Sequence, residues 1–186
     1  MPFLKTTFPG LLIFEPKVFE DSRGYFFESY NESICRQEGI EINFVQDNQA
    51  KSSYGVVRGL HYQLDPHAQT KFIRVLSGTI LDVVVDIRKG SPTYGQVFTI
   101  KLSAENKLQL LIPKGFAHGY SVISPTAEVF YKCDTFWHRE SEGGILLSDP
   151  DLNIDWEIPE SERIISEKDK LYPGIKNCNN NFIFNS

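Results

Sequence analysis

The sequence predicts an all-β protein, either a β-sandwich or a jelly-roll barrel, with few helices. Glycine occurs 13 times and proline 10 times in 186 residues, at short intervals between runs rich in Val, Ile, Phe and Tyr, which is typical of strands joined by turns. Several of these runs also alternate with a period of two residues. With 41% hydrophobic residues, the chain can bury a sizeable core at the usual length of one domain.

Four segments show the alternation expected of strands. In chain order they are residues 79–89, 98–102, 108–112 and 128–134. The first places Asp82 and Asp86 on one face and aliphatic residues on the other. In the last, Val129, Tyr131 and Cys133 share a face, so Tyr131 is expected to point inward. Strands at this spacing favour a sandwich or a jelly-roll barrel.

Helix is expected in only two places. Asn31 can cap the start of a short helix that ends at Gly39. Residues 159–173 predict at most a further turn or two, because their periodicity is weak. The tail, residues 177–186, is polar apart from an FIF triplet, and we expect it to be loosely held or docked by those three side chains.

Charge and composition exclude several classes of function. The net charge of −5 argues against a general nucleic-acid binder, which needs a basic surface. No apolar run is long enough for a membrane span, and the opening residues lack the pattern of a signal peptide. We therefore expect a cytoplasmic protein without a membrane partner. Cys35, Cys133 and Cys178 are widely spaced, which predicts buried or incidental thiols rather than a disulfide framework or a zinc site.

The segment RGLHYQ, residues 58–63, is followed closely by KFIRVLSG, residues 71–78. We expect these segments to form adjoining strands of a barrel. Arg58, His61 and Lys71 would then provide anion binding and proton abstraction, which suits acid–base chemistry next to a carbonyl on a phosphorylated substrate. Strict alternation places Arg58 and His61 on opposite faces, so both can serve one site only if a bulge or a strand end intervenes.

Pro113, Gly115 and His118 have the P-x-G-x-x-H spacing of the second motif of the cupin superfamily, which resembles the mouth of a cupin-type jelly-roll barrel. Many cupins hold a metal with an H-x-H pair and a glutamate in their first motif. Here the next histidine after His61 is His67, six residues on, and a metal needs several converging ligands. We therefore predict a barrel without a catalytic metal. A metal-dependent cupin oxygenase is the alternative.

The ordered segments together resemble the dTDP-4-dehydrorhamnose 3,5-epimerase family, cofactor-free enzymes built on a cupin barrel. The similarity runs from about residue 14 to residue 173 and includes, in order, FEDSRGYFFESY, QDNQAKSSYGVVRGLHYQ, KFIRVLSGTILDVVVDIRKGSPTYG, PKGFAHGY, EVFYKC, DPDLNIDW and ISEKD. The resemblance implies a single cupin-like epimerase domain over residues 1–186. Its barrel core would cover about residues 45–150 and its C-terminal tail about residues 174–186.

The implied reaction removes a proton beside the ketone of a 4-ketosugar, and it requires a base, a partner for the enolate oxygen and an acid on the opposite face. His61 suits the base because imidazole titrates near neutral pH, and the resemblance pairs it with Asp169. Lys71 provides positive charge for the enolate oxygen. Tyr131 corresponds to the general acid of the family.

The resemblance assigns eight further residues to substrate binding. They are Phe19, Arg23, Glu28, Gln46, Arg58, His118, Trp137 and Glu142. An arginine fork suits a diphosphate, and Trp137 lies where the family more often has a tyrosine stacked on thymine. Because the segment with Phe19, Arg23 and Glu28 reaches the neighbouring subunit in the family, a homodimer is implied.

The leading hypothesis is an epimerase that inverts carbons 3 and 5 of dTDP-4-keto-6-deoxyglucose in dTDP-L-rhamnose biosynthesis. Alternatives are an epimerase that inverts carbon 3 alone, or one that acts on another nucleotide-linked 4-ketosugar. A non-catalytic cupin that binds a sugar nucleotide is an alternative of a different class. Taken singly, each site residue also has a structural interpretation, such as a hydrogen-bonded core histidine, a packed tyrosine or a solvated charge.

Overall fold

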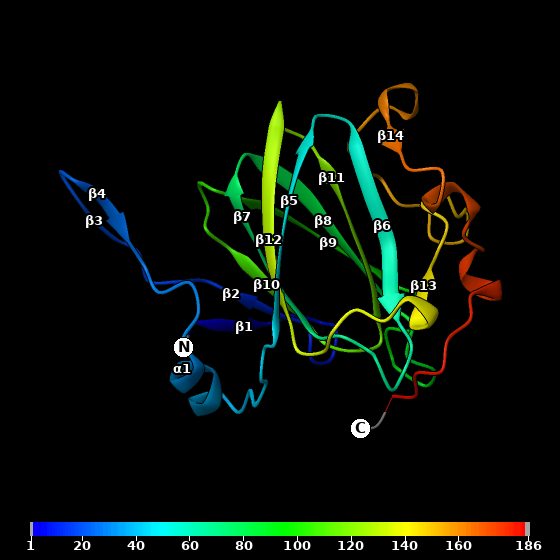
Figure 1. The fold of residues 1–186 in the computed structure, drawn as a ribbon, viewed down its shortest axis with the longest axis horizontal. Helices are drawn as coiled ribbons and strands as arrows, with labels where there is room; N and C mark the ends of the chain where they lie inside the picture. Colours follow the sequence, from blue (N-terminus) through cyan, green and yellow to red (C-terminus); the bar gives the residue numbers. More distant parts are fainter. Residues whose placement is uncertain (1, 185–186) are drawn as a thin grey trace.

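A computed structural model describes residues 2–184 and shows two six-stranded sheets packed face to face as a jelly-roll barrel (Figure 1). The first sheet contains, in spatial order, β1 (Phe3–Lys5), β2 (Leu12–Phe14), β10 (Gln109–Ile112), β7 (Lys71–Ser77), β12 (Thr126–Cys133) and β5 (Gln46–Ser53). The second contains β13 (Glu142–Gly144), β6 (Val56–Gln63), β11 (Phe116–Val122), β8 (Thr79–Asp86) and β9 (Val97–Ser103), with β14 (Ile164–Ile165) beside β6. The predicted all-β, cupin-type fold is confirmed.

The two motif-bearing strands lie in different sheets. We expected RGLHYQ and KFIRVLSG on adjoining strands, but β6 pairs with β11 and β13 whereas β7 pairs with β10 and β12. That expectation is wrong because residues 64–70 cross from one sheet to the other instead of forming a hairpin. The two strands therefore face each other across the barrel. Strands β1 and β2 also join the first sheet, from outside the range 45–150 expected for the barrel core.

Strand β8 is buried on both faces. The odd-numbered residues Leu81, Val83 and Val85 pack on the outside of the second sheet against a C-terminal layer that includes the fully buried Trp156. On the inner face, Ile80 and Val84 join the core between the two sheets. Asp82 occupies the position between these two, so the polar face predicted for this strand points into the barrel and not to solvent.

Helices are short, as predicted. The helix α1 (Glu32–Gln37) begins after Asn31, whose side chain accepts hydrogen bonds from Ser33 and Ile34, and Gly39 follows with a φ of +77°. Elsewhere in residues 2–184 the helical segments are 3₁₀ turns. They are η1 (Arg139–Ser141), η2 (Glu160–Glu162), η3 (Asp169–Leu171) and η4 (Ile175–Asn177).

The C-terminal tail is docked on the barrel. Phe182 is buried, and its backbone accepts a hydrogen bond from the N–H of Lys89. The neighbouring Ile183 is exposed, so of the expected anchors Phe182 makes the principal apolar contact. The last two residues lie outside the described part of the chain. None of the helices within residues 2–184 has the length and apolar character needed to cross a bilayer.

A two-stranded hairpin projects from the barrel near the N-terminus (Figure 1). It consists of β3 (Phe19–Asp21) and β4 (Gly24–Phe26), which form a separate two-stranded sheet and, among the described strands, pair only with each other. All six residues of its strands are exposed.

Candidate active site

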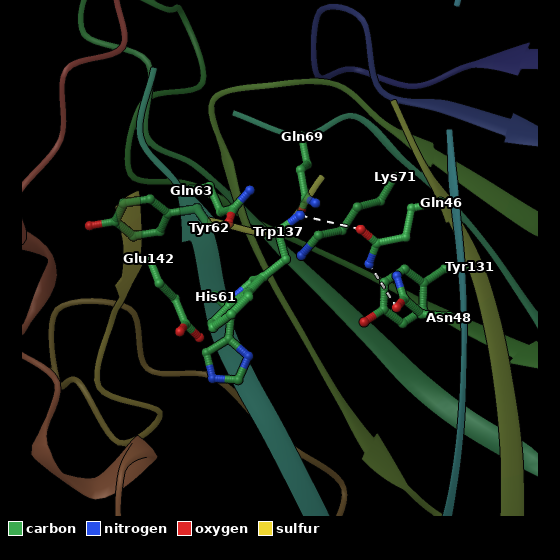
Figure 2. A pocket seen from close by; sticks show the side chains of 10 residues that line it. All are labelled: Gln46, Asn48, His61, Tyr62, Gln63, Gln69, Lys71, Tyr131, Trp137 and Glu142. Atoms are coloured by element: carbon green, nitrogen blue, oxygen red, sulfur yellow. Dashed lines mark hydrogen bonds between the residues drawn. The ribbon is translucent and has the colours of Figure 1, made fainter. Parts of the chain in front are cut away.

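A pocket of about 230 Å³ opens between the two sheets at the end of the barrel where β6 finishes and β7 begins. Its lining is mostly polar and comes from both sheets (Figure 2). The residues that line it are Gln46, Asn48, His61, Tyr62, Gln63, Gln69, Lys71, Tyr131, Trp137 and Glu142. Six of the predicted site residues are therefore together: His61, Lys71, Tyr131, Gln46, Trp137 and Glu142.

His61 is held by a buried carboxylate. Its Nε2 lies 2.8 Å from Oδ1 of Asp169, which is 4% exposed at the start of η3. Burial by itself would raise the pKa of Asp169, but hydrogen bonds from His61, the Gly59 N–H and Ser166 outweigh it and leave that pKa below its usual value. The ionised carboxylate accepts a hydrogen bond from Nε2–H, which leaves the lone pair of a neutral imidazole at Nδ1.

A bulge in β6 turns Arg58 and His61 to the same face. His61 pairs with His118 and Arg58 pairs with Tyr120, so two residues of β6 stand opposite the single residue between them in β11. Gly59 makes this possible with a φ of +127°. A Cβ there would lie 2.5 Å from the Cα of Gly119. The conflict between alternation and a shared site is thereby resolved.

Lys71 and Tyr131 enter the pocket from the first sheet, opposite His61 on the second (Figure 2). Burial lowers the pKa of the Lys71 ammonium, and Cys133, Asp82 and Glu142 offset part of this effect. Burial also raises the pKa of Tyr131 to about 12, so its phenol is protonated at neutral pH. The arrangement thus places an imidazole on one wall of the pocket and a protonated phenol and a lysine amine group on the other.

His118 lies behind the pocket and does not line it. Its ring is buried, and Nε2 lies 2.9 Å from Oδ2 of Asp82 on β8. The second oxygen of that carboxylate is buried and has no hydrogen-bond partner among residues 2–184. Arg58 is exposed nearby, where its guanidinium donates to the hydroxyl of Ser52.

Three predicted residues lie away from the pocket of their own chain. Phe19 and Arg23 belong to the projecting hairpin, where Arg23 forms an exposed ion pair with Asp21. Glu28 accepts a hydrogen bond from Asn31 before α1. A single chain therefore does not bring these three side chains to His61.

Comparison with known proteins identifies the relatives of this barrel. The family model for dTDP-4-dehydrorhamnose 3,5-epimerase matches residues 5–177. The chain belongs to this epimerase family. A family member from Shigella flexneri is 52% identical over 170 residues, which cover 91% of this chain and 93% of that protein.

Solved epimerase structures share the fold over nearly the whole chain. The enzyme from Elizabethkingia anophelis superposes with a TM-score of 0.90 at 52% identity, covering 94% of this chain and 96% of the other. A 3,5-epimerase from Legionella pneumophila, solved in complex with dTDP-4-keto-L-rhamnose, gives a TM-score of 0.89 at 45% identity, with coverage of 94% and 93%.

The epimerase pocket also contains polar residues that sequence reasoning missed: Asn48, Gln63 and Gln69. Alternation could have indicated two of them. Asn48 follows Gln46 by two residues in β5, and Gln63 follows His61 by two in β6, so each shares a face with a residue already assigned. Gln69 precedes β7 in an irregular segment, and no periodic signal marks it.

The donor set of this epimerase pocket does not suit a metal. Within the described residues, no group of three or more His, Cys, Asp or Glu side chains is placed to bind one. His118, which corresponds to the ligand position of the second cupin motif, instead contacts a single aspartate in the barrel interior. The one nearby carboxylate of the pocket wall, Glu142, pairs with Lys168 at 2.5 Å.

Proposed function

We propose that this chain is a dTDP-4-dehydrorhamnose 3,5-epimerase, an isomerase that inverts carbons 3 and 5 of dTDP-4-keto-6-deoxyglucose in dTDP-L-rhamnose biosynthesis. The observation that carries the proposal is the His61–Asp169 pair, which faces Tyr131 across a polar pocket. Its membership of the family and the relatives' printed activity support the substrate. The chemistry involves no net redox change and uses no cofactor in this proposal. A nucleotide-sugar substrate is consistent with a cytoplasmic location.

In this proposal His61 removes the proton next to the ketone through Nδ1, and Asp169 stabilises the imidazolium that forms. Lys71 stabilises the charge that develops on the ketone oxygen. Tyr131 returns a proton to the carbon from the opposite side, which inverts the configuration. The opposed positions of β6 and β12, in different sheets, support this division of roles.

Substrate binding is assigned to the remaining predicted residues. Arg58 is turned to the same face as His61 and is exposed, which suits contact with the diphosphate. Trp137 offers a half-exposed indole at the pocket rim for stacking on the nucleobase. Gln46 and Glu142 line the same pocket. His118 does not line the pocket, so in this proposal it acts indirectly, through its buried contact with Asp82 inside the barrel.

Turnover in deuterated water tests the proposal. Because each inversion replaces a carbon-bound proton with one from solvent, the product should carry one deuterium at carbon 3 and one at carbon 5, as read by NMR and mass spectrometry. Deuterium at carbon 3 alone would indicate the single-carbon epimerase. Binding of dTDP without any exchange would indicate the non-catalytic cupin.

We further propose that the protein is a homodimer in which the β3–β4 hairpin lies on the partner chain and brings Phe19, Arg23 and Glu28 to the partner's pocket. Three aromatic side chains of the hairpin, Phe19, Tyr25 and Phe26, are each more than half exposed, an unusual apolar surface for an isolated arm. At its base, a hollow of about 700 Å³ is lined by residues that include Phe14, Phe19 and Glu28.

The molar mass in solution is expected to be twice the 21.3 kDa of one chain, as measured by light scattering after size exclusion. Tyr25→Ser combined with Phe26→Ser should shift the population toward monomer, because it removes most of the apolar surface of the arm. Tyr94→Ser, which changes an exposed aromatic residue outside the hairpin, should leave the mass unchanged. A monomeric wild-type protein would contradict the proposed dimer.

A further inference from the structure

The segment that carries Trp137 has no regular secondary structure. Residues 135–138, called here the Trp137 loop, follow β12 and precede η1. Phe136 and Trp137 are 66% and 56% exposed, so their rings contribute little to holding the loop in place. The conformation of this loop must come from other contacts.

Three glutamine side chains supply these contacts, each from a different part of the barrel. Gln69 donates to the carbonyl of Thr135 at 2.7 Å. Gln46 on β5 accepts from the N–H of Trp137 at 3.2 Å (Figure 2). Gln63 on β6 holds the backbone on both sides of Trp137: it donates to the carbonyl of Phe136 at 3.3 Å and accepts from the N–H of His138 at 2.6 Å.

Gln63 is the central member of this set. It is 5% exposed, and its amide also donates to the carbonyl of His67 at 2.7 Å. One side chain therefore ties the Trp137 loop to the connection between β6 and β7. The rings of His67 and His138 stack across the same junction, with centroids 3.9 Å apart and planes within 6° of parallel. An amide suits this position because, among side chains, only a primary amide offers two N–H donors and a carbonyl acceptor together, and Gln63 uses all three.

We propose that Gln63 is a positioning residue that holds Trp137 ready for a planar nucleobase, with Gln46 and Gln69 in supporting roles. This inference rests on the proposed function, in which Trp137 stacks on the base of a nucleoside diphosphate. Fixing the backbone before binding removes the entropy cost of ordering the loop when the ligand arrives. Gln63 then contributes to nucleotide affinity without touching the reacting carbons.

Gln63→Met tests this inference, because it preserves approximate length and volume and removes the amide. The affinity for dTDP, measured by calorimetry, should fall roughly 5- to 30-fold, corresponding to the loss of one or two kcal/mol. KM should rise by a similar factor while kcat stays within about twofold, since the base and acid are unchanged. Gln109→Met is the matched control: this glutamine is also buried and donates to one carbonyl, Ser29, away from the pocket.

Tryptophan fluorescence reports on the loop without any ligand. The only other tryptophan, Trp156, is fully buried, so quenching by acrylamide samples Trp137. Gln63→Met should increase quenching and lower the anisotropy of the quenchable fraction, and Gln109→Met should do neither. If the wild-type protein does not bind dTDP, the proposed function is refuted. The fluorescence measurements would then still test whether Gln63 holds the Trp137 loop.

Gln69→Met provides a second variant, because it removes only the bond to Thr135 and is expected to shift affinity and anisotropy in the same direction by less. If Gln63→Met does not fold, the affinity and anisotropy of Gln69→Met test the inference in its place. Wild-type affinity and anisotropy in the folded Gln63→Met protein would overturn the inference. A fall in kcat with unchanged KM would do so as well, because it would assign Gln63 to the chemical step.

Discussion

Replacing His61 with alanine should lower kcat by about 10²–10⁴-fold, the usual effect of removing a general base. The imidazole is held 2.8 Å from a buried, ionised carboxylate, and no other histidine of residues 2–184 lines the pocket. Affinity for dTDP should change little, because dTDP lacks the sugar ring on which His61 acts. Stopped assays with the ketosugar and calorimetry with dTDP measure the two effects separately.

Chemical rescue sharpens this test. Free imidazole can enter the space left by the side chain and accept the same proton, so it should restore part of the lost rate in His61→Ala. It should not stimulate the wild-type enzyme. Turnover of His61→Ala at the wild-type rate would remove this residue from the mechanism, and loss of dTDP binding would show that its role is in binding.

Tyr131→Phe should lower the rate of inversion by about 10²–10⁴-fold, as expected for loss of a general acid, while exchange of the substrate proton with solvent continues. The substitution removes only a hydroxyl, so packing beside Val129 is preserved. Burial raises the pKa of this phenol to about 12, so the wild-type hydroxyl is protonated at neutral pH and can donate. The variant has no hydroxyl and therefore no proton to donate. His61 can still remove and return the proton on its own face.

NMR in deuterated water, run beside product analysis, separates the possible roles of Tyr131. Exchange that persists while inversion is lost would support the acid. Equal loss of exchange and inversion would instead indicate that Tyr131 positions the sugar, and retention of both would make it a core residue. Tyr120→Phe is the matched control, because this buried tyrosine lies on β11 and does not line the pocket.

The inward orientation of Tyr131 could be predicted because it depends only on local alternation. Val129 and Tyr131 both belong to the core between the sheets, as the pattern of that run indicated. The helix after Asn31 was predictable for the same reason, since a cap and a terminating glycine act within a few residues. Features encoded by neighbouring residues are therefore accessible from one sequence.

Features that depend on distant segments were not accessible. The length of residues 64–70 permits either a hairpin or a crossover, so the pairing of β6 and β7 was predicted wrongly. The bulge that brings Arg58 and His61 to one face depends on the close approach of Gly119 in another strand. Gln63 was missed as a loop contact because its partners, Phe136 and His138, lie more than seventy positions away.

The bulge makes position 59 of β6 intolerant of substitution, because a Cβ there would collide with Gly119. Before and after the bulge, the side chains alternate between the two faces of the sheet in different phases. Leu60 and Tyr62 pack into the apolar layer outside the second sheet. A side chain at position 59 that straightened the strand without changing its length would place Arg58 and His61 on opposite faces and force one of them into that layer, where an unpaired polar group is costly. The shared orientation of these two side chains therefore depends on a glycine that lies between them.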